Sequence, residues 1–237
     1  MKCTCPYTII GSGRVAKHFA HYFGLLNIPF MQWSRASDPE EKQLENSVRN
    51  SECILVLIND DAIENFIDMH PFLNDKRLVH FSGNLSTELA HGAHPLMTFT
   101  ESLYDLATYD SVPFILDNPD WETKTLLPGL KNDSFYIPKE QKALYHSLCV
   151  MSNNFTCMLW DKFFSELHES FKLPKNVAFP YLKQTMKNLQ NLDCSPLTGP
   201  LVRGDNKTIQ SNLASLQNDP FQDIYAAFVK MRQKPLT

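Results

Sequence analysis

The sequence predicts an α/β protein in which a doubly wound parallel sheet precedes a smaller, all-helical domain. Over the first 137 residues, short apolar runs alternate with helical patterns, which is typical of βαβ units. From Lys139 onward, apolar residues recur at steps of three and four, the spacing of amphipathic helices. We therefore expect an α/β domain at residues 1–137 and a helical domain at residues 138–237.

The elements of the first domain can be placed by their apolar patterns. Helices are expected to start near Arg14, Asp38 and Asn59. The run Cys53–Ile58 is nearly all apolar, as in a strand that is buried on both faces of a parallel sheet. The expected strands are Tyr7–Ile10, Ile28–Trp33, Cys53–Ile58, Leu78–Phe81, Pro113–Leu116 and Ser134–Ile137.

The second domain is expected to begin with one long helix over residues 139–169. Leu144, Leu148 and Met151 fall on one stripe of that helix. Shorter helices are expected at residues 177–192, 209–216 and 223–231.

Composition excludes several classes of protein. Apolar residues make up 43% of the chain and charged residues 20%, so the chain is expected to be folded. A net charge of −4 argues against a nucleic-acid binder. The longest strongly apolar run, Ile54–Ile58, is far shorter than the roughly 20 residues that span a membrane. Since no secretory signal is visible, we expect a cytoplasmic protein.

The six cysteines are expected to be thiols, because disulfides are rare in reducing compartments. Cys3 and Cys5 form the closest pair. No second pair has the spacing of a metal site, so no metal is expected.

A glycine-rich turn carries the strongest functional signal. The string Gly11-Ser12-Gly13-Arg14-Val15-Ala16 follows an expected strand and opens an expected helix. In such a Gly-x-Gly-x-x-Ala turn, Gly11 permits the tight bend, Gly13 lets the backbone approach a pyrophosphate, and Ala16 allows close packing. The sequence therefore predicts a Rossmann-type domain that binds a dinucleotide at the helix N-terminus.

The residues after the second strand indicate which dinucleotide binds. NAD is usually held by an acid about 20 residues beyond the turn. Ser34 and Arg35 occupy that place here, and an arginine can neutralise a 2′-phosphate. We therefore predict NADP. Four residues at the ends of later strands are also expected near the cofactor: Ile58, Asn59, Ser82 and Gly83.

Four motifs in this order resemble a known bacterial family. They are the turn at residues 11–16, His-Pro-Leu-Met-Thr-Phe at 94–99, Tyr-His at 145–146 followed by Asn-Asn at 153–154, and Leu-Thr-Gly-Pro-Leu-Val-Arg-Gly-Asp at 197–205. In that family a Rossmann-like NADP-binding domain precedes a helical domain of unknown function. The family is similar to ketopantoate reductase and pyrroline-5-carboxylate reductase. The resemblance implies a homodimer, with substrate held in a cleft between the domains.

Three residues are candidates for catalysis: His94 in the expected α/β domain, and His146 and Asn153 on the expected long helix. His94 sits in a string similar to one in prephenate dehydrogenases, where the histidine contacts the substrate hydroxyl, and imidazole can exchange a proton near neutral pH. A structural role for His94, in which it orients the loop before Pro95, has equal weight with the catalytic role. His146 and Asn153 are seven residues apart, so they share a helix face, where packing could equally account for them. Related dehydrogenases carry a lysine acid at the place of Val150, so in an enzyme His146 or His94 would have to replace it.

Arg203 is the fourth candidate. Its guanidinium suits a carboxylate or phosphate on a substrate, although a solvent-exposed role is equally weighted. Asp205 is expected to cap the next helix.

Two functions remain open from the sequence. We favour an NADP-dependent oxidoreductase that acts on a small carbonyl, imine or hydroxy compound near His94, His146, Asn153 and Arg203. The alternative is a sensor that binds NADP without chemistry, which the absence of the lysine favours.

Overall fold

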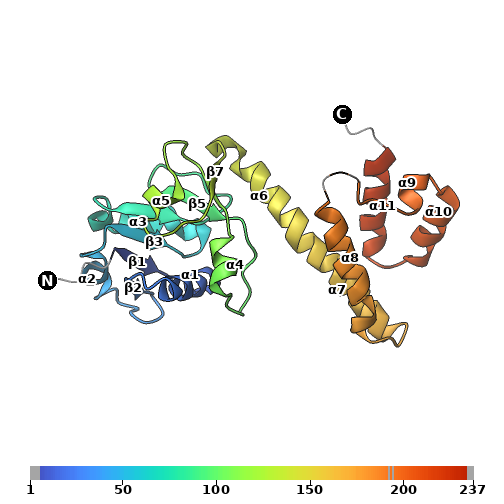
Figure 1. The fold of residues 1–237 in the computed structure, drawn as a ribbon, viewed down its shortest axis with the longest axis horizontal. Helices are drawn as coiled ribbons and strands as arrows, with labels where there is room; N and C mark the ends of the chain where they lie inside the picture. The colour runs from blue at the N-terminus through green and yellow to red at the C-terminus, as the bar shows by residue number, and fades with distance from the viewer. Residues whose placement is uncertain (1–5, 192, 194, 234–237) are drawn as a thin grey trace. The chain divides into compact units, whose positions relative to one another are not determined.

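The computed structural model describes residues 6–191, 193 and 195–233, and contains a seven-stranded sheet (Figure 1). The strand order is β2-β1-β3-β4-β5-β6-β7, in which β1 to β5 are parallel, β6 is antiparallel to β5, and β7 is parallel to β6. The expected α/β class with a doubly wound sheet and a helical C-terminal region is confirmed. The strands are β1 Tyr7–Ile10, β2 Phe30–Trp33, β3 Cys53–Val56, β4 Arg77–His80, β5 His91–Pro95, β6 Phe114–Leu116 and β7 Ser134–Tyr136.

Helices connect the strands and form the C-terminal region. Those of the sheet region are α1 Arg14–Leu25, α2 Leu44–Val48, α3 Ile63–Met69, α4 Leu106–Asp110 and α5 Thr123–Leu126. The expected long helix is present as α6 Lys142–Val150, a π-helical turn η4 Met151–Phe155, and α7 Thr156–Glu169. The remaining helices are α8 Phe179–Leu189, α9 Pro200–Arg203, α10 Asn206–Ser215 and α11 Phe221–Gln233.

The sheet is covered on both faces. Helices α1, α4 and α5 pack on one face through residues such as Phe19, Phe23 and Tyr109. Helices α2 and α3 pack on the other through Leu44 and Phe66. All four residues of β3 are buried, as the apolar run predicted. Each such buried apolar side chain stabilises the fold by about 1.5–3 kcal/mol.

The helix expected to start at Asp38 begins later, at Leu44. The Asp38 carboxylate instead organises the loop after β2. It accepts hydrogen bonds from Trp33 Nε1 at 2.9 Å and from the backbone N–H groups of Lys42 at 3.2 Å and Gln43 at 2.7 Å. Asp38 is therefore a loop-fixing residue, and this loop carries Ser34 and Arg35.

The chain forms two compact units, residues 1–159 and residues 160–237. The division falls within α7, later than the expected domain boundary at residue 138, which was placed where the helical pattern begins. In the second unit, Trp160 packs against the ring of Tyr181, with centroids 5.7 Å apart. Lys162 forms ion pairs with Glu166 and Asp219 there.

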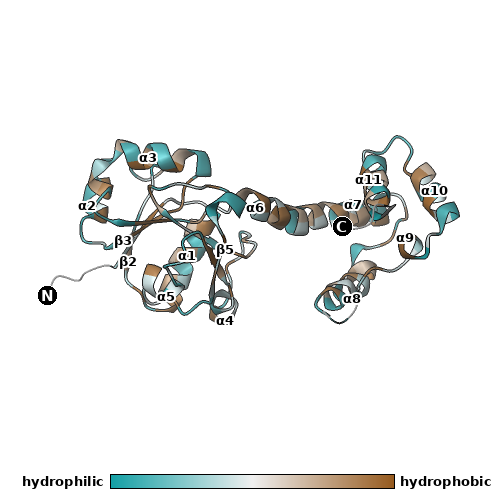
Figure 2. Cartoon of the chain, turned by 90° about the horizontal axis from the view of Figure 1, so that it is seen from above, coloured by the Kyte–Doolittle hydropathy of each residue, from teal (hydrophilic) through white to brown (hydrophobic). Residues whose placement is uncertain are grey.

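Apolar residues run along α6, which carries several brown stretches in Figure 2, and Met151 and Phe155 of the π turn continue them in the sequence. Several are solvent-exposed, among them Leu144, Leu148, Met151 and Phe155. No helix in the described part of the chain is both long and apolar enough to cross a membrane.

The strand order positions the ligand site. Strand β1 lies between β2 and β3, so the chain leaves β1 on one side for β2 and later returns on the other side. Ligands of open α/β sheets bind at the carboxyl ends of the strands beside such a switch point. Here that place is the end of β1 at Ile10, which pairs with Val56 of β3.

Candidate active site

The turn after β1 requires glycine at its first position. Gly11 has a φ of +131°, and a Cβ there would lie 2.1 Å from the carbonyl oxygen of Leu57. Its N–H donates to the Trp33 carbonyl at 2.8 Å, and the Leu57 N–H donates to the Ile10 carbonyl at 2.8 Å. Gly11 therefore lets the ends of three neighbouring strands meet closely, as expected for the tight turn.

The N-terminus of α1 is open. Gly13 is its N-cap residue, no side chain caps the helix, and the first turn carries no acid. A Cβ on Gly13 would meet no atom within 4 Å. The first N–H groups of a helix lack partners within the helix, and its positive end attracts anions. Ala16 is fully buried, which allows α1 to pack closely on the sheet.

A cavity of about 850 Å³ lies beside this turn, and all its walls belong to the first unit. The cavity extends from the glycine turn to His94 on β5 and His146 on α6. We call the part beside the turn the nucleotide end and the part beside the two histidines the histidine end. The sequence-predicted residues that line it are Ser12, Gly13, Arg14, Val15, Arg35, Ile58, Asn59, Ser82, His94, His146 and Asn153.

The loop after β2 presents Arg35 to the cavity, but its guanidinium also has a protein partner. Nε and Nη2 of Arg35 donate to the Glu41 carboxylate at 3.1 and 2.8 Å. Glu41 also contacts His70 Nε2 at 2.8 Å. The hydrogen bonds from His70 and Arg35 lower the pKa of Glu41, so this carboxylate is charged. Ser34 does not line the cavity, and its hydroxyl bonds to that of Ser37 at 3.1 Å.

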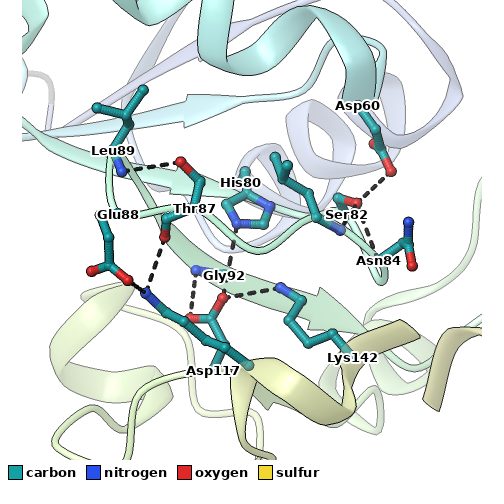
Figure 3. Close-up of polar contacts among 12 residues, drawn as sticks. Asp60, His80, Ser82, Asn84, Thr87, Glu88, Leu89, Gly92, Asp117 and Lys142 are labelled. Carbon is teal, nitrogen blue, oxygen red and sulfur yellow. Dashed lines mark hydrogen bonds and ion pairs between the residues drawn. The ribbon is translucent and has the colours of Figure 1, made fainter. Parts of the chain in front are cut away.

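Two strand ends supply a polar wall. Asn59 lines the cavity directly before the short 3₁₀ helix Asp60–Ala62. Ser82 Oγ bonds to the Asp60 carboxylate and accepts the N–H groups of Asn84 and Leu85 at 3.2 and 2.9 Å (Figure 3). Ser82 thus fixes the loop after β4 as well as facing the cavity. Asp60 was not among the residues predicted from the sequence, because its contact with Ser82 joins residues 22 positions apart in the chain.

The histidine end is built by β5 and α6. His94 Nδ1 lies 2.7 Å from the Tyr145 hydroxyl, and the rings of His94 and His146 have centroids 6.1 Å apart. Burial lowers the pKa of His94 to about 4, and the charges of His146 and Lys142 act in the same direction. Burial also raises the pKa of Tyr145, so its phenol keeps its proton. At neutral pH, His94 is therefore a neutral imidazole beside a neutral phenol.

One ring nitrogen of His146 lacks a hydrogen-bond partner. Its Nδ1 is buried and has no hydrogen-bond partner among the residues that the structure describes. Buried polar atoms are nearly always paired, so the unpaired Nδ1 of this cavity-lining histidine is an exception. Gly83 lies against the two histidine rings and does not line the cavity itself.

The other two candidates lie apart in the chain. Asn153 falls in the π turn η4, where Nδ2 lies 3.0 Å from Asn154 Oδ1 and 3.5 Å from Thr98 Oγ1. A π turn is rare and is frequent at functional sites. Arg203 belongs to the second unit, at the end of α9, and its role stays a prediction. Asp205 caps α10 as expected, accepting the Thr208 N–H at 3.1 Å.

A second ionisable cluster near α6 was missed by sequence reasoning. Lys142 Nζ lies 3.0 Å from Asp117 Oδ2, both side chains are 3% exposed, and Asp117 also accepts the Gly92 N–H at 2.9 Å (Figure 3). Burial would raise the pKa of Asp117, but Lys142 outweighs it and the pKa is lowered. His80 Nε2 lies 3.9 Å from the same carboxylate, and burial lowers the pKa of His80 to about 4. No sequence motif joins these three residues.

No group of three or more His, Cys, Asp or Glu side chains suits a metal ion within residues 6–191, 193 and 195–233. Cys53, Cys149 and Cys157 are free thiols. Cys3, Cys5 and Cys194 lie outside the described residues.

Comparison with known proteins supports the fold. Residues 120–231 match the family model described as Domain of unknown function (DUF2520). No curated protein matches the chain. A Bacteroides fragilis protein, provisionally named an NADP oxidoreductase, has 21% identity and a TM-score of 0.73, covering 96% of this chain and 97% of its own.

Two further solved structures are similar over nearly the whole chain. A Thermotoga maritima protein has 23% identity and a TM-score of 0.69, with 96% of each chain covered. The pyrroline carboxylate reductase of Plasmodium falciparum, solved with NADP bound, has 12% identity and a TM-score of 0.58, with 95% of each chain covered. The resemblance inferred from the motifs is thus confirmed: the chain has the Rossmann-type fold with a helical C-terminal region that these proteins share, and its residues 120–231 match the DUF2520 model.

Proposed function

We propose that this chain is an NADP-dependent oxidoreductase, which passes a hydride between the nicotinamide and a small carbonyl, imine or hydroxy compound. One observation carries the proposal. A single cavity joins an uncapped helix N-terminus behind a glycine turn to two histidines, His94 and His146. Several neighbours in fold are named as reductases, some solved with NADP or NADPH, which supports the same reaction class.

The nucleotide end fits the cofactor. The open backbone at Gly13 and the first N–H groups of α1 would hold the pyrophosphate. Arg35 would hold the 2′-phosphate, while Glu41 keeps its guanidinium in place. Ile58 and Asn59 would lie against the rest of the nucleotide.

The histidine end fits the reacting part of a substrate. When bound, the cofactor supplies or accepts the hydride. A proton must move on or off the substrate at the same stage, and His94 and His146 are the imidazoles of the cavity wall that can hold it. Asn153 offers an amide for orientation, and Arg203 is proposed as a contact for an acidic substrate group.

A sensor that binds NADP without chemistry is the second candidate. Val150 favours it, because related dehydrogenases carry their lysine acid at that place. The two histidines favour the enzyme, since a sensor has no need for a pair of proton-carrying groups beside the cofactor.

The cofactor assignment is tested by titrating NADP and NAD against Arg35→Met. Loss of a charge-assisted hydrogen bond costs about 1.5–3 kcal/mol, so NADP should bind about 10- to 100-fold more weakly while NAD binding changes little. Arg49→Met is the matched control, because Arg49 is equally exposed at 64% and also has a glutamate partner. Equal weakening of NAD and NADP, or preference for NAD in the wild type, would contradict the NADP assignment.

Catalysis is tested with a panel of keto acids, ketones, imines and hydroxy acids, followed by NADPH consumption. NADP should raise the unfolding free energy by about 2.7 kcal/mol at 100 times its Kd. Binding with turnover supports the enzyme. Binding without turnover across the panel supports the sensor, and no stabilisation by NADP contradicts both.

We also infer a homodimer in the cytoplasm. Exposed Leu144, Leu148, Met151 and Phe155 recur along one helix, and contiguous apolar surface of this kind usually marks an interface. Sedimentation equilibrium should give twice the chain mass of 27.2 kDa. A monomer at micromolar concentration would contradict the dimer.

A further inference from the structure

One histidine outside the cavity contacts two oxygen atoms at once. His70 directly follows α3 and is 7% exposed. Its Nδ1 lies 2.6 Å from the carbonyl oxygen of Phe66, one helical turn earlier, and its Nε2 lies 2.8 Å from Oε2 of Glu41. The ring thus joins the end of α3 to the loop after β2, which carries Arg35.

The ring is the donor in both contacts, because a carbonyl and a carboxylate only accept hydrogen bonds. The hydrogen bonds from His70 and Arg35 lower the pKa of Glu41, so the acceptor is a charged carboxylate. Hydrogen bonds to charged groups are stronger than neutral ones, and the side chains of His70 and Glu41 are only 9% and 23% exposed. His70 therefore holds Oε2 of Glu41 in one place.

This contact limits how Glu41 can bind Arg35. The guanidinium donates from Nε at 3.1 Å and from Nη2 at 2.8 Å, and both hydrogen bonds go to the same oxygen, Oε1. Nη1 has no partner among the described residues, and Arg35 lines the cavity. One edge of the guanidinium is therefore held by the protein, while Nη1 is available to a ligand.

The backbone of Glu41 indicates that these contacts determine its place. Its φ is +55°, in the left-handed region that is uncommon for residues other than glycine. Such conformations persist where the surroundings hold them, and they cluster at functional sites. Besides the two side-chain contacts, the Glu41 N–H donates to the Asp38 carbonyl at 3.1 Å.

Without His70, both oxygens of Glu41 could turn onto Arg35. Carboxylates frequently bind arginine through two parallel hydrogen bonds, one to each oxygen. A carboxylate bound in that way would take up donors of the guanidinium that a 2′-phosphate needs. It would also repel the phosphate, which carries about −1.5 to −2 charges.

We propose that His70 is a specificity-determining residue for NADP, which restricts Glu41 to one oxygen on Arg35 and so keeps Arg35 Nη1 for the 2′-phosphate. His70 is a positioning residue, because it acts through Glu41 and does not line the cavity itself. The proposal rests on the proposed function, which assigns the 2′-phosphate to Arg35. NAD lacks that phosphate, so the effect of His70 falls on NADP alone.

The hold of His70 on Glu41 is tested without cofactor, by crystal structures of the full chain and of its His70→Leu variant. The wild type should show Oε1 of Glu41 on Arg35 and Oε2 on His70. In His70→Leu, both oxygens of Glu41 should contact the guanidinium. A Glu41 that keeps a single oxygen on Arg35 in the variant would overturn the proposal, whether or not NADP binds.

The effect on the cofactor is tested by titrating NADP and NAD against His70→Leu, after far-UV circular dichroism has shown that the variant is folded. The Kd of NADP should rise about 3- to 5-fold, the range of an exposed ion pair, while the Kd of NAD changes less than about 1.5-fold. NAD thus reports any general damage to α3, which also lines the cavity. Exposed His168→Leu is the control and should change neither Kd. Equal weakening of both dinucleotides, or no weakening of NADP, would overturn the proposal.

A double-mutant cycle with Glu41→Ala separates an effect through Glu41 from a general structural effect. Alanine leaves no carboxylate to turn onto Arg35, so adding His70→Leu should then change the Kd of NADP less than about 1.5-fold. A loss of NADP affinity as large as that in the presence of Glu41 would show that His70 acts by another route, and would overturn the proposal. Failure of the wild type to bind NADP would instead refute the proposed function.

Discussion

Two histidines stand near the carboxyl ends of neighbouring strands and face the same helix, yet their surroundings differ. His80 ends β4 and is fully buried, beside the ion pair of Asp117 with Lys142 of α6. His94 lies on β5, borders the cavity, and bonds to Tyr145 of α6. Burial lowers the pKa of both to about 4, so the pKa does not distinguish them.

The difference between them lies in access. His80 is fully buried and does not line the cavity, so we expect it to act in packing. His94 shares a wall with the nucleotide-binding turn. A perturbed pKa marks a functional group only when the group can also reach a substrate.

The largest predicted effect is a difference in kcat/KM between variants of His94 and variants of His80. His94→Gln should lower kcat/KM by about 10²- to 10⁴-fold, the range of an acid–base group, with NADP binding kept. His80→Gln should leave kcat/KM within about threefold and lower the free energy of unfolding by about 1–3 kcal/mol, because an amide of different shape replaces a fully buried ring. Steady-state kinetics and urea denaturation measure both. Equal loss of activity in the two variants would remove the distinction.

The ion pair beside His80 should dominate stability. Lys142→Met would leave the Asp117 carboxylate buried without its partner, and such a change costs about 3–5 kcal/mol. Adding Asp117→Asn should recover part of that loss, since the charge is then removed. Lys131→Met, at an exposed lysine, is the control and should cost less than about 0.5 kcal/mol. A loss as small as that of the control would show that Lys142 does not fix α6 to the sheet.

The smallest effect should appear as a pH dependence of stability. The folded-state pKa of His80 lies near 4, below its ordinary value of 6.5, so the unfolded chain takes up the proton first as pH falls. The free energy of unfolding should therefore fall between pH 6.5 and 4, by up to about 3 kcal/mol for this histidine. His80→Gln should flatten that slope, and exposed His168→Gln should not. A slope unchanged in His80→Gln would contradict the lowered pKa.

Local patterns were sufficient for much of the fold. The turn at residues 11–16 and the apolar run of β3 were located from the sequence because their signals are set by neighbouring residues. The late start of α2 was not predicted, because an aspartate at position 38 can either begin a helix or accept hydrogen bonds within a loop. Only the position of Trp33, whose indole N–H bonds to Asp38, decides between them.

The candidate site divides in the same way. His94, His146 and Asn153 could be named because they belong to strings of characteristic composition. Tyr145 stands next to His146 in the chain, but its role depends on a contact with His94, 51 residues earlier. Lys142 and Asp117 had no signal at all, because an isolated lysine and an isolated aspartate are usually solvated.

The sequence by itself determined the fold class, the glycine turn, and the set of histidines that could carry a proton. Those features depend on periodicity and on residues adjacent in the chain. Only the tertiary structure decided that His94 and His146 both line the cavity and lie against Gly83, while His80 is fully buried. The physical reason is that access and hydrogen-bond partners depend on which strand ends and helix turns meet in space, and residues far apart in the chain supply them.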